Sequence, residues 1–185
     1  MTTFILDGIW GGHSRWEWLR RRIENEVGPC TIWRYDNSGR TSLVELGARL
    51  RSALQSLGEP VNLVGYSMGG LVVREAMRAN TETEIHRVAL LHSPHGGSLA
   101  ALALPLPACR EMRPGSRFLK DLDATPPTVP ILVTWCLWDA VVVPGISARW
   151  KHATRVLQSH VPAHAWPVVC PRIHGAVADF LKATP

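Results

Sequence analysis

Val61-Asn62-Leu63-Val64-Gly65-Tyr66-Ser67-Met68-Gly69-Gly70-Leu71-Val72-Val73 is the stretch of sequence that decides the fold. An apolar run precedes Gly65 and a second follows Gly70, so the stretch predicts a buried strand, a tight turn and a helix. Residues 65–69 match G-x-S-x-G, in which small residues flank a serine because the backbone is crowded there. The helix N-terminus favours negative charge beside the serine hydroxyl. The pattern predicts Ser67 as a nucleophile; the alternative is a glycine-rich turn with an incidental serine.

Outside this stretch, short apolar runs alternate with amphipathic stretches, which is typical of a parallel sheet with crossover helices. One domain is expected over residues 1–185, because a second would leave each half short of core. Ser42 is followed three residues later by Glu45, which predicts a capping box at the start of a helix that ends before Gly58. The other expected helices cover 16–27, 71–77 and 172–181, and the expected strands cover 4–6, 31–33, 61–64, 87–91, 129–136 and 155–159.

The segment 93–130 has a different texture, with seven prolines that break any long element. It is too short for a separate cap domain. We expect a loop with one or two brief helices that forms a minimal lid over the ends of the strands.

The composition is that of an ordinary globular protein, with 46% hydrophobic and 19% charged residues and a net charge of +5. The arginines are dispersed along helical stretches, so no nucleic-acid partner is expected. No apolar run approaches the roughly 18 residues that cross a bilayer, so no stable membrane insertion is expected. The first residues lack a signal-peptide pattern, which indicates the cytoplasm, or secretion if the chain is a mature form. The four cysteines are widely spaced, so neither a metal site nor a disulfide framework is predicted.

Four segments together resemble one family: 63–71, Ser-Pro-His-Gly-Gly-Ser at 93–98, 112–116 and 37–42. They look like α/β-hydrolases, and among these like the small bacterial lipases and esterases. The resemblance covers most of the chain. It implies a single-domain α/β-hydrolase with a mostly parallel central sheet of about six strands, flanked by helices and carrying a minimal lid. It also implies cleavage of carboxylic esters through an acyl-enzyme, with no cofactor.

The acid and the base should follow Ser67 in the order Asp or Glu, then His. Asp139 ends an apolar run, so it is placed just past the carboxyl end of a strand, where catalytic residues gather. The family's D-x-x-V-x-P pattern fits residues 139–144. Of the three histidines after the last expected strand, His164 lies in a loop and has a proline seven positions later, as in the family. His160 is the second candidate, and His174 falls in the closing helix.

Two further histidines, His92 and His95, have no such context, and a lone histidine is more often structural. His95 is expected to support the turn around Ser67 from behind.

Two backbone N–H groups should stabilise the oxyanion of an acyl transfer. One is that of Met68, directly after the nucleophile. By similarity the other is that of Ile9, in the loop Asp7-Gly8-Ile9-Trp10-Gly11-Gly12, where the family has His-Gly-x-x-Gly. The departure is Asp7 in place of histidine. We expect this carboxylate to accept hydrogen bonds from its own loop and to take no part in the chemistry.

Four tryptophans flank the inferred site, Trp10, Trp138, Trp166 and Trp33, and the first three are the candidates for substrate binding. Trp10 and Trp166 are the better candidates for an apolar acyl pocket, which the segment 99–107 could complete. The expected substrate is a small-molecule or lipid ester. The alternatives are a thioesterase, an amidase or an acyltransferase with the same triad, because the acyl-enzyme is common to them, or a non-catalytic binding protein on this fold.

Overall fold

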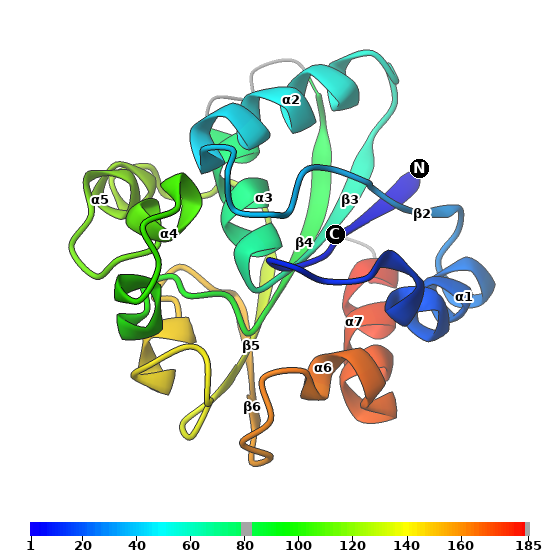
Figure 1. The fold of residues 1–185 in the computed structure, drawn as a ribbon. Coiled ribbons are helices and arrows are strands. Elements are labelled where there is room, and N and C mark those ends of the chain that lie inside the picture. The colour runs from blue at the N-terminus through cyan, green and yellow to red at the C-terminus, as the bar shows by residue number, and fades with distance from the viewer. Residues whose placement is uncertain (79–82, 184–185) are drawn as a thin grey trace.

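A six-stranded parallel sheet forms the centre of the computed structural model, which describes residues 1–78 and 83–183, apart from the side chain of His13 (Figure 1). The strand order is β2-β1-β3-β4-β5-β6, and every neighbouring pair is parallel. The strands are β1 (Thr2–Leu6), β2 (Cys30–Ile32), β3 (Val61–Tyr66), β4 (Ile85–Leu91), β5 (Ile131–Cys136) and β6 (Arg155–Ser159). The expected fold class is confirmed, and each predicted strand is present with its ends shifted by no more than two residues.

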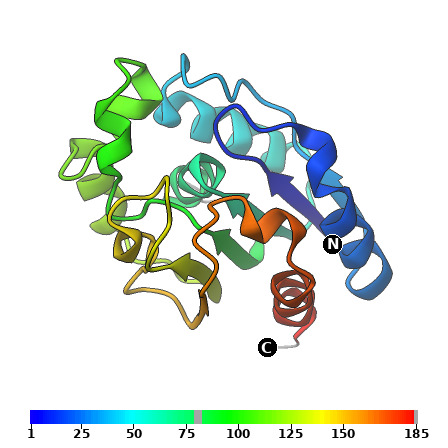
Figure 2. The ribbon, with the colours of Figure 1, turned by 60° about the horizontal axis from the view of Figure 1, so that its bottom comes forward.

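Helices cover both faces of the sheet (Figures 1 and 2). One face carries α1 (Glu17–Glu26), α6 (Trp166–Val169) and α7 (Pro171–Lys182). The other carries α2 (Leu43–Gln55), α3 (Met68–Arg78), α4 (Pro107–Glu111) and α5 (Arg117–Asp123). Three short 3-10 helices complete the structure: η1 (His13–Trp16), η2 (Leu99–Leu102) and η3 (Gly145–Ala148). No helix within the described ranges is long and apolar enough to span a membrane.

The two faces have separate apolar cores, because successive strand side chains point to opposite sides. In β1, Phe4 and Leu6 pack with α2 and α3, whereas Ile5 packs with α1 and α7. β3 is buried along its whole length. Burial on both faces explains why the central strands are nearly continuous apolar runs.

The predicted capping box at α2 is only half present. Ser42 caps the helix, with its Oγ 3.1 Å from the N–H of Val44. Glu45 pairs with Arg49 one turn later instead of reaching back. A distant carboxylate, Glu111, accepts from the N–H of Leu43 and from Ser42 Oγ, at 2.5 and 2.7 Å. Glu111 therefore fixes α4 against the start of α2.

The segment 93–130 carries η2, α4 and α5 and lies at the carboxyl ends of the strands (Figure 2). Hydrogen bonds tie it to the loop after β5: Leu99 N–H donates to Val143 O at 2.7 Å, and Ser98 Oγ donates to Val141 O at 2.7 Å. Two loops that are distant in sequence are thereby joined beside Ser67.

Candidate active site

The turn between β3 and α3 holds Ser67 in a left-handed conformation, with φ of 52°. The residues two positions before and after it, Gly65 and Gly69, must be glycine for steric reasons. A Cβ on Gly65 would lie 2.5 Å from Gly70 Cα, and one on Gly69 would lie 2.5 Å from the carbonyl oxygen of Asp7. The Ser67 N–H donates to Leu91 O at 2.9 Å, which continues the β3–β4 ladder one residue past the strand. The G-x-S-x-G pattern thus gives a close-packed strand–turn–helix unit.

The structure brings the three side chains named from the sequence into one hydrogen-bonded row. His164 Nε2 lies 2.9 Å from Ser67 Oγ, and His164 Nδ1 lies 2.9 Å from Asp139 Oδ2. Since Asp139 is an acceptor, Nδ1 carries the proton and Nε2 is left to accept from the serine hydroxyl. The second candidate, His160, has an exposed side chain.

The loop that carries His164 is held by Tyr66, the residue before Ser67. Tyr66 OH donates to the backbone carbonyl of His164 at 3.1 Å, and the two rings lie 5.1 Å apart. Burial is the main cause that raises the pKa of the Tyr66 phenol, so it stays a donor. His174 is buried in α7 and donates from Nε2 to Pro167 O at 2.9 Å, away from this row.

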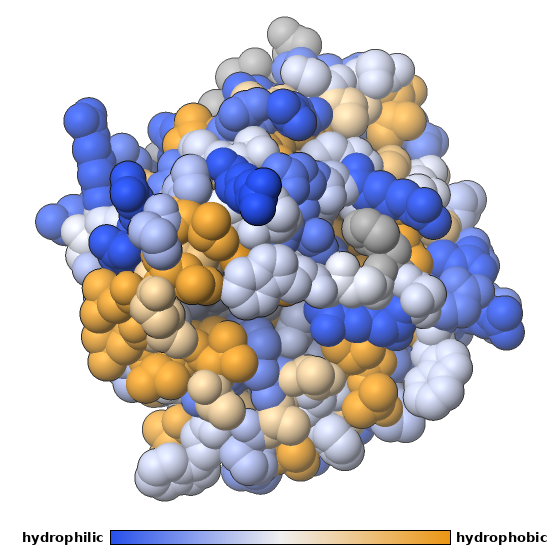
Figure 3. Space-filling view, viewed as in Figure 1, coloured by the Kyte–Doolittle hydropathy of each residue, from blue (hydrophilic) through white to orange (hydrophobic). Residues whose placement is uncertain are grey.

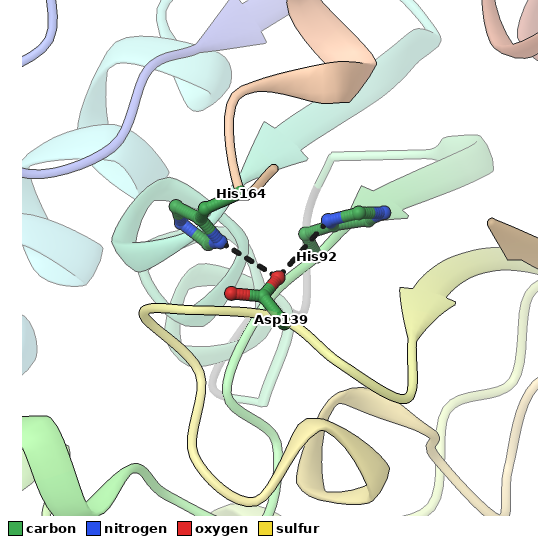
Figure 4. Close-up of side chains that lie close together, drawn as sticks. All are labelled: His92, Asp139 and His164. Atoms are coloured by element: carbon green, nitrogen blue, oxygen red, sulfur yellow. Dashed lines mark hydrogen bonds and ion pairs between the residues drawn. The ribbon is translucent and has the colours of Figure 1, made fainter. Parts of the chain in front are cut away.

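Asp139 is buried and accepts four hydrogen bonds. Oδ1 accepts from the N–H groups of Val141 and Val142 at 2.8 and 2.9 Å, and Oδ2 accepts from His164 and from His92, the latter at 3.1 Å (Figure 4). Burial alone would raise the pKa of Asp139, but hydrogen bonds from both histidines lower it below its usual range. The carboxylate is therefore ionised throughout the neutral range.

His92 is the residue that sequence reasoning missed. It was expected to be a structural histidine outside the site, yet it contacts the same carboxylate oxygen as His164. Its position was the available signal, because it directly follows β4, the neighbour of the strand that bears Ser67. His95, three residues later, packs against α3: it stacks on Trp150 at 5.3 Å, and its Nδ1 lies 3.4 Å from an Arg74 nitrogen.

The loop after β1 lies against Ser67. A Cβ on Gly8 would lie 2.8 Å from Ser67 Cβ, and Ile9 lines the same cavity as Ser67. Met68 is the first residue of α3, and the first N–H groups of a helix have no partner within it. Asn37 Nδ2 holds the loop by donating to Gly8 O and Gly11 O, each at 3.0 Å. Both N–H groups named from the sequence belong to segments that border Ser67.

Asp7 points into its own loop. Its Oδ1 accepts from the Gly8 N–H at 2.7 Å, and its carboxylate forms an ion pair with Arg15. The Asp7 side chain is fully buried, so Arg15 supplies the charge that balances it. The expected hydrogen bond from the loop is present, and the negative charge is neutralised where it sits.

A mostly apolar cavity of about 130 Å³ opens beside Ser67. Of the three tryptophans considered, Trp10 lines it, with its Nε1 donating to Ser38 O at 3.0 Å. Trp138 and Trp166 are not among its lining residues. Trp138 is 73% exposed in the turn after β5, and Trp166 packs against the core on the other face of the sheet. The lining is Ile9, Trp10, Ser67, Pro94, Ser98, Ala100, Ala101, Leu104, Cys109, Met112, Val141 and Val142.

Apolar side chains also gather on the surface around this cavity, over η2 and the segment 137–148 (Figure 3). Leu99, Leu102 and Ile146 are each about half exposed there, at 50%, 56% and 45%. The mouth of the cavity is therefore apolar as well as its interior.

His92, Asp139 and His164 also form a group whose nitrogen and oxygen atoms lie within 4.8 Å of one another, close enough to hold a metal ion. Both histidines use Nδ1 in their bonds to Asp139. An ion bound by these nitrogens would displace the protons and break both hydrogen bonds. Metal binding and the row that ends at Ser67 are alternative states of the same atoms.

Comparison with known proteins gives a family and a set of similar folds. A model of the Alpha/beta hydrolase family matches residues 8–183. No curated protein matches the chain. A Listeria innocua protein, the product of lin2722, is 13% identical with a TM-score of 0.75, and the match covers 100% of this chain and 95% of that one.

Two similar structures are named lipases. Monoacylglycerol lipase from Paleococcus ferrophilus is 15% identical with a TM-score of 0.75, covering 98% of this chain and 93% of that one. Lipase BlEst2 from Bacillus licheniformis, in its mature form, is 19% identical with a TM-score of 0.73, covering 98% and 92%. At these identities the likeness is one of fold.

Proposed function

The chain belongs to the alpha/beta hydrolase family, and from this premise we propose that it is a serine hydrolase that cleaves carboxylic esters. Ser67 is the nucleophile, His164 the general base and acid, and Asp139 the carboxylate that orients the imidazole. The observation that carries the proposal is the pair of 2.9 Å contacts that join Ser67 to His164 and His164 to Asp139.

The reaction begins when Ser67 Oγ attacks the ester carbonyl carbon and His164 Nε2 takes the hydroxyl proton. The carbonyl electron pair moves onto oxygen, where the N–H groups of Ile9 and Met68 stabilise the negative charge. As the intermediate collapses, the C–O bond to the alcohol breaks, and His164 returns the proton to the departing alkoxide. Asp139 remains ionised and stabilises the imidazolium.

In the second half, water attacks the acyl-enzyme carbonyl carbon while His164 Nε2 takes its proton. The second tetrahedral intermediate then breaks the bond to Ser67 Oγ, which recovers the proton. The products are a carboxylic acid and an alcohol, and the enzyme is unchanged.

The apolar cavity beside Ser67 supports an ester with an alkyl or aryl acyl group. Trp10 contributes one wall, and the segment 93–130 acts as a minimal lid that closes the cavity through Ala101, Leu104 and Met112. The names of two similar structures, both lipases, favour small-molecule or lipid esters over other acyl donors.

A fluorophosphonate probe together with p-nitrophenyl ester turnover tests the proposal. The wild-type protein should be labelled at Ser67. Ser67→Ala should abolish labelling and lower turnover by about six orders of magnitude. A matched control is Ser93→Ala, which removes another buried serine close to the turn but outside the row. Ester, thioester and anilide substrates with the same acyl group separate esterase from thioesterase and amidase activity. Unlabelled wild-type protein, or a Ser67→Ala variant that retains activity, would refute the proposal.

A further inference from the structure

His92 stands at the end of β4, between the strand that carries Ser67 and the strand that precedes Asp139. The hydrogen-bond ladder continues past the strand ends on both sides of it. Ser67 N–H donates to Leu91 O, and His92 N–H donates to Thr134 O, each at 2.9 Å. The His92 backbone is thus fixed in register with both neighbours. Its φ of 46° is one of three positive values at non-glycine residues in the described chain, and Ser67 has another.

The His92 side chain has one polar partner among the described residues, and that partner is Asp139. The ring is fully buried, and its Nε2 has no hydrogen-bond partner in the described chain. To donate to a carboxylate, Nδ1 must carry the proton, so Nε2 is left as a buried acceptor. Burial lowers the pKa of His92, against the opposing effect of Asp139, which keeps the ring neutral. A buried ring with an unsatisfied nitrogen is a poor choice for packing alone, since an apolar side chain would fill this space at lower cost.

Asp139 needs both of its oxygens oriented if it is to align His164. Backbone N–H groups of its own turn hold Oδ1, but they leave Oδ2 free to accept from any direction. His92 reaches Oδ2 from the side opposite His164 (Figure 4). The centroids of the two histidine rings lie 6.1 Å apart. Of the two, His164 is the one that hydrogen-bonds to Ser67 Oγ.

We propose that His92 is a positioning residue whose Nδ1–H fixes the oxygen of Asp139 that orients His164. The proposal rests on the proposed serine hydrolase function. Removing a residue that holds a directly engaged group in position typically lowers activity by about 10- to 100-fold. The role is distinct from that of a base, because the His92 side chain does not line the cavity and bonds to Asp139, whereas Ser67 Oγ bonds to His164.

Two substitutions of His92 distinguish the effect of losing its hydrogen bond to Asp139 from the effect of losing the ring. His92→Asn keeps an N–H donor at the same distance from Cβ and tolerates a positive φ. His92→Leu fills the space without a donor. We expect His92→Leu to lower kcat about 10- to 100-fold with KM nearly unchanged, and His92→Asn to keep most of the wild-type kcat. Circular dichroism and thermal unfolding verify that both variants are folded. If His92→Leu does not fold, His92→Gly replaces it, because glycine accepts the positive φ without a donor.

A chelator arm addresses the metal alternative. Wild-type kcat should be the same with and without EDTA, because the row uses protons where a metal would bind. Activity that EDTA removes and Zn²⁺ restores would overturn the proposal and make the cluster a metal site.

Other outcomes distinguish a failure of the positioning role from a failure of the hydrolase function. Full kcat in folded His92→Leu, or equal losses in the Leu and Asn variants, would overturn the positioning role while fluorophosphonate labelling of wild-type Ser67 leaves the hydrolase function standing. Wild-type protein that is neither labelled nor active would overturn both.

Discussion

Lowering the pH should destabilise this protein through its buried histidines, well above the range in which carboxylates titrate. His92, His95 and His174 are buried, and burial is the leading cause that lowers the pKa of each. In the unfolded chain the same groups titrate near pH 6.5. Below that pH the unfolded state binds protons that the folded state does not, so the free energy of unfolding falls as the pH falls.

The size of the effect follows from how far each ring is withheld from protonation. His95 has a pKa well below its ordinary value, because it is buried and lies beside the Arg74 guanidinium. A histidine that stays neutral costs about 1 kcal/mol of stability between about pH 7 and about pH 5.5. The expected loss is therefore about 1 kcal/mol from His95, with contributions of the same sign from His92 and His174, against a typical total of about 5–15 kcal/mol. The carboxylate of Asp139, whose pKa is lowered, adds its own loss only below about pH 4.

Urea unfolding followed by tryptophan fluorescence at a series of pH values measures this slope. His95→Phe keeps a ring against Trp150 and removes one titrating group, so it should reduce the loss by about 1 kcal/mol. His160→Gln is the matched control: it removes a histidine with an exposed side chain and leaves the three buried rings in place. Stability that is constant between about pH 7 and about pH 5.5, or an unchanged slope in His95→Phe, would refute the reasoning.

Three further measurements test the site. Tyr66→Phe removes the 3.1 Å bond to the His164 carbonyl, worth about 1 kcal/mol, so kcat should fall about fivefold with KM unchanged; an unaltered kcat would show that the bond does not hold the loop. Arg15→Gln leaves the buried Asp7 carboxylate without its ion pair. Because Arg15 itself is 31% exposed, the cost should be about 2 kcal/mol in urea unfolding, and Asp7→Asn in the same chain should recover part of it; simple additivity would contradict the pairing. The cavity of about 130 Å³ has room for about four methylene groups. On a series of p-nitrophenyl esters, kcat/KM should therefore rise about fourfold per methylene and level off near hexanoate, whereas a steady rise to palmitate would contradict a closed acyl pocket.

The strands could be predicted because each central strand is buried on both faces and reads as a continuous apolar run. The exact first and last residues of the strands were harder to predict from the sequence. β4 begins at Ile85, two residues before the expected start, since Ile85 pairs with Val61 across a register shift that the sequence does not reveal. Contacts between segments that are distant in sequence could not be predicted either. Glu111 stabilises the start of α2 from 69 positions away, and local spacing pointed to Glu45 instead.

In the candidate site, too, some residues could be predicted from the sequence and others could not. Ser67, Asp139 and His164 were named from local context and order, and the structure brings them within hydrogen-bond distance. His92 was predicted to be structural, because the role that we propose for it depends on the order of strands in the sheet and not on its neighbours in sequence. The tryptophans were named for their proximity in sequence to the inferred site. Only Trp10 reaches the cavity, because the orientation of a large side chain is decided by packing that single-sequence patterns do not encode.

Two carboxylates border the turn of Ser67, and each is committed to partners of its own before a substrate arrives. Asp7 is paired with Arg15 and accepts the N–H of Gly8, and Asp139 accepts four hydrogen bonds from donors on three segments of the chain. An unbalanced carboxylate at this distance would oppose the negative charge that develops on an ester oxygen, the more so in an apolar cavity. The charge of Asp7 is balanced by Arg15, and that of Asp139 is directed toward His164, while the N–H groups at the start of α3 point in the direction that favours an anion. Aspartate in place of the histidine usual in the family is compatible with acyl transfer for this reason: its charge is paired with that of Arg15, and the pair is electrically neutral.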